Sequence, residues 1–128
     1  MKIAARPLLL VVLLSLLGAS SVQAQAPDSL LQGMREAYQQ LDYDLAEQQA
    51  MTALAFYDRF TNVQLVEIHT TLALVNYAQN EPESARRQFE NALALQPELR
   101  LDPLLLPPQI LAFFEQIKQE AQAPIEPQ

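Results

Sequence analysis

Apolar side chains recur at helical spacing along most of the chain, and the pattern is clearest between Leu72 and Pro97. Four residues of this stretch occupy positions i, i+4, i+7 and i+8, namely Ala85, Phe89, Ala92 and Leu93. That spacing places them on one side of a helix, with polar and charged residues on the other side. Residues 66–77 carry a similar stripe just upstream, so the pattern predicts two antiparallel helices joined by a short turn.

Residues that favour helix ends stand where these two helices should begin and end. Pro82 suits the first turn of the second helix, which does not use its backbone N–H, and acidic residues on both sides of it face the positive end of the helix dipole. Pro97 is expected to end this helix. Thr61 and Gln64 have the three-residue separation of a capping box, which predicts the start of the first helix.

This hairpin resembles the tetratricopeptide repeat (TPR), whose pattern is W-x2-L-G-x2-Y, then A-x3-F, then P, over about 34 residues. The residues that match the pattern are Leu72, Ala73, Ala85, Phe89, Ala92 and Pro97. His69 and Asn76 stand where the family has Trp and Tyr, and Tyr77 follows one position late. The resemblance implies an α-solenoid that binds partners on its concave side, which is lined by the first helix of each hairpin.

A less regular copy of the hairpin precedes it. Residues 28–41 and 45–57 each carry a helical stripe, with a break at residues 42–44, and we expect Asp28 to cap the first of these helices. The two copies are offset by 39 residues, which is longer than the family period of about 34. The surplus is expected between the hairpins, at residues 56–62.

After Pro97 the pattern changes. Residues 99–108 contain three prolines and five leucines, which favours an extended, partly buried strap over a helix. Pro108 can then open a last helix, whose apolar face is formed by Ile110, Phe113, Phe114, Ile117 and Ala121. We expect this helix to cover the end of the second hairpin, because a short solenoid needs a cap.

The predicted fold is therefore all-α, with two TPR-like helical hairpins plus a C-terminal capping helix that form a short α-solenoid. This domain is expected to cover residues 25–121. Residues 122–128, which include two prolines, are expected to form a disordered tail.

Residues 1–24 read as a signal peptide. Lys2 and Arg6 form a charged start, an apolar run follows, and Val22-Gln23-Ala24 offers a cleavage pattern before Gln25. An uncleaved membrane anchor is the alternative, but the apolar run at residues 7–17 is shorter than the roughly 20 residues that cross a bilayer. A short, strongly apolar signal is typical of bacteria, so we expect a periplasmic or secreted protein with no membrane span after cleavage.

The net charge and the residue types present limit the classes of partner and of functional site that the chain can have. Residues 25–128 hold six basic and fifteen acidic side chains, a formal net charge of −9. This charge disfavours binding to nucleic acids or anionic membrane surfaces and favours a basic protein or peptide partner. The same residues hold no cysteine, two serines, one glycine and one histidine. We therefore expect no catalytic site, no cofactor and no metal, and a half-buried structural position for His69.

The function expected from these features is that of a non-enzymatic scaffold or adaptor in the bacterial cell envelope, which binds a protein or peptide. The resemblance assigns the partner-binding surface to seven residues: Arg35, Tyr38, Gln39, Glu67, Thr70, Leu74 and Tyr77. The two tyrosines are equivalent in the two copies, and tyrosine at a helix surface serves either binding or packing. The alternative function is a structural subunit of a homo-oligomeric or hetero-oligomeric envelope assembly, docking through the Leu/Pro/Phe-rich segment 101–117.

Overall fold

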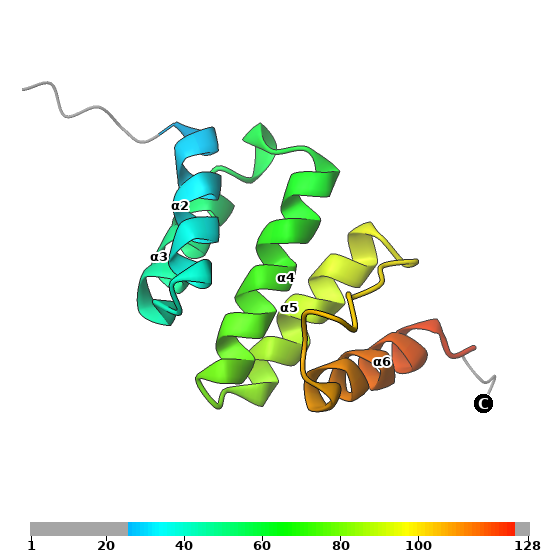
Figure 1. Ribbon diagram of the computed structural model, residues 1–128. Helices are drawn as coiled ribbons and strands as arrows, with labels where there is room; N and C mark the ends of the chain where they lie inside the picture. Colours follow the sequence, from blue (N-terminus) through cyan, green and yellow to red (C-terminus); the bar gives the residue numbers. More distant parts are fainter. Residues whose placement is uncertain (1–25, 125–128) are drawn as a thin grey trace, which may run out of the picture.

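A computed structural model describes residues 26–124 of the chain (Figure 1). These residues contain five α-helices and one 3-10 turn, and they contain no β-strand. The elements in chain order are α2 (Pro27–Gln39), α3 (Tyr43–Leu54), η2 (Tyr57–Arg59), α4 (Asn62–Ala78), α5 (Pro82–Leu95) and α6 (Pro108–Gln122). The predicted all-α fold is thus confirmed. The predicted signal peptide, residues 1–24, lies outside the described residues, as does the end of the predicted tail, residues 125–128.

The helices form two hairpins followed by a C-terminal helix. α2 packs against α3 and α4 packs against α5, while α3 also contacts α4 and α6 contacts α5 (Figure 1). Each helix therefore lies mainly against its neighbours in sequence, as in a solenoid.

Local sequence signals set most of the helix starts. Pro82 and Pro108 are the first residues of α5 and α6. The predicted capping box of α4 is present, because the Thr61 hydroxyl accepts a hydrogen bond from the Gln64 N–H (3.2 Å) and the Gln64 side-chain oxygen accepts one from the Thr61 N–H (2.9 Å). The expected cap at Asp28 is wrong, because α2 begins one residue earlier and places Asp28 inside its first turn.

The turns of the two hairpins are copies of each other. Leu41 and Asn80 stand 39 residues apart, and both adopt the left-handed backbone conformation, with φ of 61° and 64°. The residues that follow them, Asp42 and Glu81, each donate the backbone N–H to the carbonyl five residues back, over 2.9 Å in both turns. This is the Schellman pattern of a helix C-terminus. The offset predicted from the sequence therefore recurs in the backbone.

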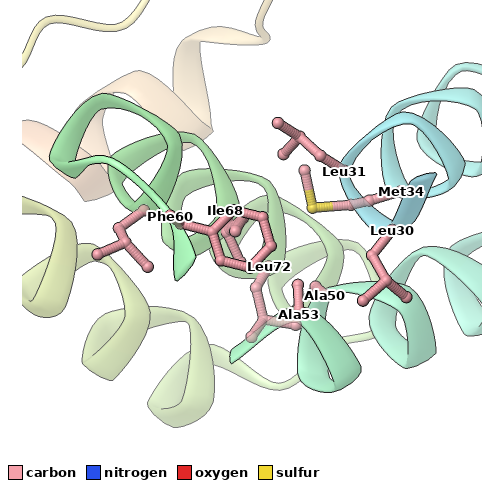
Figure 2. Close-up of a cluster of buried hydrophobic side chains, with 9 residues drawn as sticks. Leu30, Leu31, Met34, Ala50, Ala53, Phe60, Ile68 and Leu72 are labelled. Atoms are coloured by element: carbon pink, nitrogen blue, oxygen red, sulfur yellow. The ribbon is translucent and has the colours of Figure 1, made fainter. Parts of the chain in front are cut away.

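The first core lies between the two hairpins, and the linker from α3 to α4 contributes to it. After η2, Phe60 turns inward and is only 8% exposed. Figure 2 shows it together with side chains from α2, α3 and α4, namely Leu30, Leu31, Met34, Ala50, Ala53, Ile68 and Leu72. The alanines of α3 let the neighbouring helices approach closely, and the larger side chains fill the remaining space.

The second core joins α4 and α5 to α6, and its buried members are Ala73, Leu74, Phe89, Leu93, Phe114 and Ile117. Phe89 is completely buried, and its ring lies 5.1 Å from the ring of Phe114, edge to face, and 6.2 Å from that of Phe113. Edge-to-face contact is a favoured arrangement of aromatic rings. α6 therefore covers the second hairpin as predicted. Ala121 was expected on the apolar face of this helix, but it is exposed. It lines a surface notch between the last turns of α5 and α6.

Residues 96–107 form a non-helical strap, as the prolines predict. Three of its leucines pack against the second core, namely Leu99, Leu101 and Leu106. Two side chains of α6 hold the start of the strap. Lys118 Nζ donates a hydrogen bond to the Leu99 carbonyl (2.8 Å), and Gln122 Nε2 donates one to the Pro97 carbonyl (2.9 Å).

Replacing Phe89 with alanine should lower the free energy of unfolding by about 3–5 kcal/mol, because the side chains of two helices would surround an empty space. Thermal unfolding followed by circular dichroism measures the loss. Asn91→Ala, at an exposed position of the same helix, is the matched control and should change stability little. A Phe89→Ala variant as stable as its parent would refute the assignment of this ring to the core.

Replacing Leu41 with glycine should raise the free energy of unfolding by about 0.5–1 kcal/mol. Glycine adopts the left-handed conformation without the steric cost that leucine bears, and this gain exceeds the loss from a more flexible unfolded chain. Little packing is lost, since the Leu41 side chain is 69% exposed. The same change at Asn80 should gain less, because asparagine tolerates this conformation. Urea unfolding of both variants is the measurement, and a larger gain at Asn80 than at Leu41 would contradict the argument.

Candidate binding surface

The seven residues predicted to bind a partner lie on the first helices of the two hairpins, and these helices contact each other. α2 carries Arg35, Tyr38 and Gln39, and α4 carries Glu67, Thr70, Leu74 and Tyr77. The structure brings Arg35 and Glu67 into direct contact and gives the other five residues different surroundings.

Arg35 and Glu67 form a bidentate ion pair that links α2 to α4. Arg35 Nε lies 2.6 Å from Glu67 Oε1, and Arg35 Nη2 lies 2.8 Å from Glu67 Oε2. The hydrogen bonding to Glu67 raises the pKa of the Arg35 guanidinium above its usual value. Both side chains remain accessible, with 45% and 33% of their surface exposed. Because exposed pairs contribute only about 0–1 kcal/mol to stability, this pair can exchange partners without unfolding the protein.

Tyr38 is half-buried and contributes to packing. Its ring lies 6.2 Å from the ring of Tyr43 on α3. It also packs against the second core and against a smaller cluster formed by one alanine each from α2 and α3 with Val75 of α4. Burial, with a smaller effect of Tyr43, raises the pKa of the Tyr38 hydroxyl. Gln39, the next residue, is exposed and free to meet a partner.

The end of α4 that carries Leu74 and Tyr77 is covered by the C-terminal part of the domain. Leu74 belongs to the second core. The Tyr77 ring lies 5.2 Å from the ring of Phe113 on α6. Thr70 is half-buried, and its hydroxyl oxygen has no hydrogen-bond partner among the described residues. The two equivalent tyrosines thus differ in their ring neighbours, because Tyr38 lies beside Tyr43 of α3 and Tyr77 lies beside Phe113 of α6.

His69 is held within the fold. It is 5% exposed, so it lies deeper than the half-buried position expected from the sequence. Its Nδ1 atom lies 2.8 Å from Oε1 of Gln88 on α5, and its ring lies 6.1 Å from that of Tyr57. Within residues 26–124, no group of three or more His, Cys, Asp or Glu side chains is placed to hold a metal ion.

Two leucines of the strap project into solvent. Leu104 is 92% exposed and Leu105 is 78% exposed. Asp102 fixes the turn that carries them, because its side chain accepts a hydrogen bond from the Leu104 N–H (2.8 Å) and its carbonyl accepts one from the Leu105 N–H (3.1 Å). The Asp-Pro step at residues 102 and 103 signals a turn in the sequence, but no sequence signal showed that its leucines face outward. These four residues, 102–105, are termed the leucine turn.

No helix within the described part of the chain is long and apolar enough to cross a membrane. Comparisons with protein-family models, with curated proteins and with solved structures found no match to this chain.

Proposed function

We propose that the protein is an exported, non-enzymatic scaffold or adaptor of the bacterial cell envelope, built on two TPR-like hairpins, which binds a protein or peptide partner. The copied turns of the two hairpins support a repeat architecture, and repeat proteins bind partners on surfaces that extend over several repeats. The observation that carries the proposal is the ion pair of Arg35 and Glu67, because it is exposed and connects the first helices of both hairpins.

The surface formed by Arg35, Gln39 and Glu67, termed the α2–α4 surface, suits a polar or basic segment of a partner. A lysine or arginine of the partner can bind the Glu67 carboxylate, while Arg35 turns to a carbonyl or carboxylate of the same segment. Exchanging one exposed ion pair for another costs little, since neither pair contributes much to the fold. The net charge of −9 on residues 25–128 attracts a basic segment over short distances.

The remaining predicted residues have a supporting role in this proposal. Leu74 and Tyr77 pack against the second core and α6, so they fix the position of α4, from which Glu67 projects. Tyr38 similarly links α2 to α3. The ion pair gives a cleaner test of binding than the tyrosines, because truncating either tyrosine would also remove packing.

Reversing the ion pair tests the proposal. The double variant Arg35→Glu with Glu67→Arg keeps a salt bridge but inverts its polarity, so it should unfold within about 1 kcal/mol of the parent protein. Its capture of partner proteins from a crosslinked envelope extract, measured by quantitative mass spectrometry, should fall at least several-fold, because the partner would meet a charge of its own sign.

The matched control for this test is the double variant Arg86→Glu with Glu120→Arg, which reverses a second ion pair and leaves the net charge unchanged. Glu120 pairs with Arg86 at 2.7 Å on the α5–α6 side of the molecule, and that pair is also accessible to solvent. This variant should capture the same proteins in the same amounts as the parent. Unchanged capture by the reversed-pair variant would remove the α2–α4 surface as the binding site.

A second candidate function is a structural subunit of an envelope assembly, and the leucine turn favours it. Phe113 and Phe114 of the segment expected to dock in such an assembly are engaged in the second core. Leu104 and Leu105 are the exposed large hydrophobic residues of that segment. Docking in this proposal therefore uses the leucine turn and leaves the α2–α4 surface free.

A further inference from the structure

We propose that the leucine turn of one molecule inserts into the notch between α5 and α6 of a second copy of this chain. The inference rests on the second proposed function, a subunit of an envelope assembly, and it names the chain itself as one partner. The observations behind it are the exposure of Leu104 and Leu105, the apolar lining of the notch, and the separation of the two features on the molecule.

The notch is a surface cavity of about 310 Å3 at the ends of α5 and α6. Four of the six residues that line it are apolar, and the full set is Glu90, Leu93, Ala94, Pro97, Ala121 and Gln122. Leu93 is almost fully buried, whereas the others are exposed, so an apolar surface forms the inner side of the notch. An apolar side chain from another molecule would be removed from water there.

The sizes of the two features agree. A protein cavity of about 150 Å3 accommodates benzene, which has six carbons. The side chains of Leu104 and Leu105 have four carbons each, so the notch has room for both. The two hydrogen bonds to Asp102 already fix the turn, and a preorganised group loses less conformational freedom on binding than a flexible one.

The positions of the two features require two different molecules. Leu105 stands three residues before the first residue of α6, whereas Ala121 and Gln122 belong to its last turn. A helix of 15 residues spans about 22 Å, and the packing of Leu99 and Leu101 against the second core holds the strap in place, so the leucine turn lies away from the notch of its own chain. Each contact uses two different patches, which is a heterologous arrangement that continues head to tail into a chain or a ring.

Two other modes of self-association are less favourable. The outer side of α6 exposes mainly polar residues, including Gln109, Glu115, Gln116 and Gln119, so stacking of solenoid ends would bury little apolar surface. Contact between two leucine turns would leave the outer sides of these leucines in water, because neither turn offers a recess with an apolar lining such as the notch. Insertion into the notch also brings the edges of α5 and α6 against the partner molecule.

Charge sets how the association should depend on salt. Each copy carries a net charge of −9 over residues 25–128, so two copies repel each other at low ionic strength. Salt screens this repulsion and leaves the apolar contact in place. Association should therefore strengthen several-fold when the salt concentration rises from about 0.02 M to 0.3 M.

The test uses protein purified from cells that express the full 128-residue sequence, studied by analytical ultracentrifugation from about 10 μM to 1 mM. The parent protein should associate in this range. The turn variant, Leu104→Ser with Leu105→Ser, and the notch variant, Ala94→Arg, should each raise the dissociation constant at least about tenfold. Ala94→Arg also lowers the net negative charge, so repulsion cannot explain its loss of association. Val63→Ser, at a position 76% exposed on α4, is the matched control and should associate like the parent.

Mixing the two defective variants gives the decisive result. The notch variant keeps an intact leucine turn and the turn variant keeps an intact notch, so an equimolar mixture should form particles of two molecules and no larger species. A monomeric mixture, or a turn variant that still associates like the parent, would overturn the proposal, provided that circular dichroism shows both variants folded.

A parent protein that stays monomeric at every concentration and salt level would also overturn it. The assembly function would survive that outcome if the turn variant loses a different protein that the parent captures from the envelope extract. Binding of the monomer to neutral lipid vesicles, abolished in the turn variant, would assign the leucine turn to a membrane surface and reject the second copy. None of these outcomes alters the test of the α2–α4 surface, since Arg35 and Glu67 are unchanged in all these variants.

Discussion

The contact of Phe89 with the aromatic rings of α6 holds the second half of the domain together. Phe113 of α6 also contacts Tyr77 on α4. The aromatic rings of α6 therefore touch both helices of the second hairpin. α6 also fastens the strap through the bond from Lys118 to the Leu99 carbonyl. The hairpin, the last helix and the strap therefore form one packed unit, and the position of α4 depends on it.

The two hairpins fill the same structural position with different residues. Ala50 in α3 stands 39 residues before Phe89 in α5. Phe89 contacts α6, whereas the small side chain of Ala50 lets the neighbouring helix approach closely. The large side chains that fill the core around Ala50 are Phe60 in the linker and Ile68 in α4. The first hairpin is therefore less regular in sequence because a large side chain from outside the repeated segment completes its core.

The sequence predicted the helices and the hairpins well, because their signals are local. Pro82 and the pair Thr61 and Gln64 act on backbone groups within one turn of the helix. The contact between Arg35 and Glu67 was not predictable, since it joins two flexible side chains 32 residues apart across two hairpins. Nor could the sequence show which leucines of the strap face inward, because a segment without periodicity does not define a buried side.

The tip of the leucine turn is exposed to solvent, whereas the residues on both sides of the turn are packed against the second core. Leu101 and Leu106 pack against the second core on either side of it, and Asp102 closes it with two hydrogen bonds. Exposed tips of this kind tolerate inserted residues, because no buried backbone group has to move. A short epitope inserted there would leave the packed unit and both termini intact, and it would at the same time keep Leu104 and Leu105 from entering the notch of a second copy.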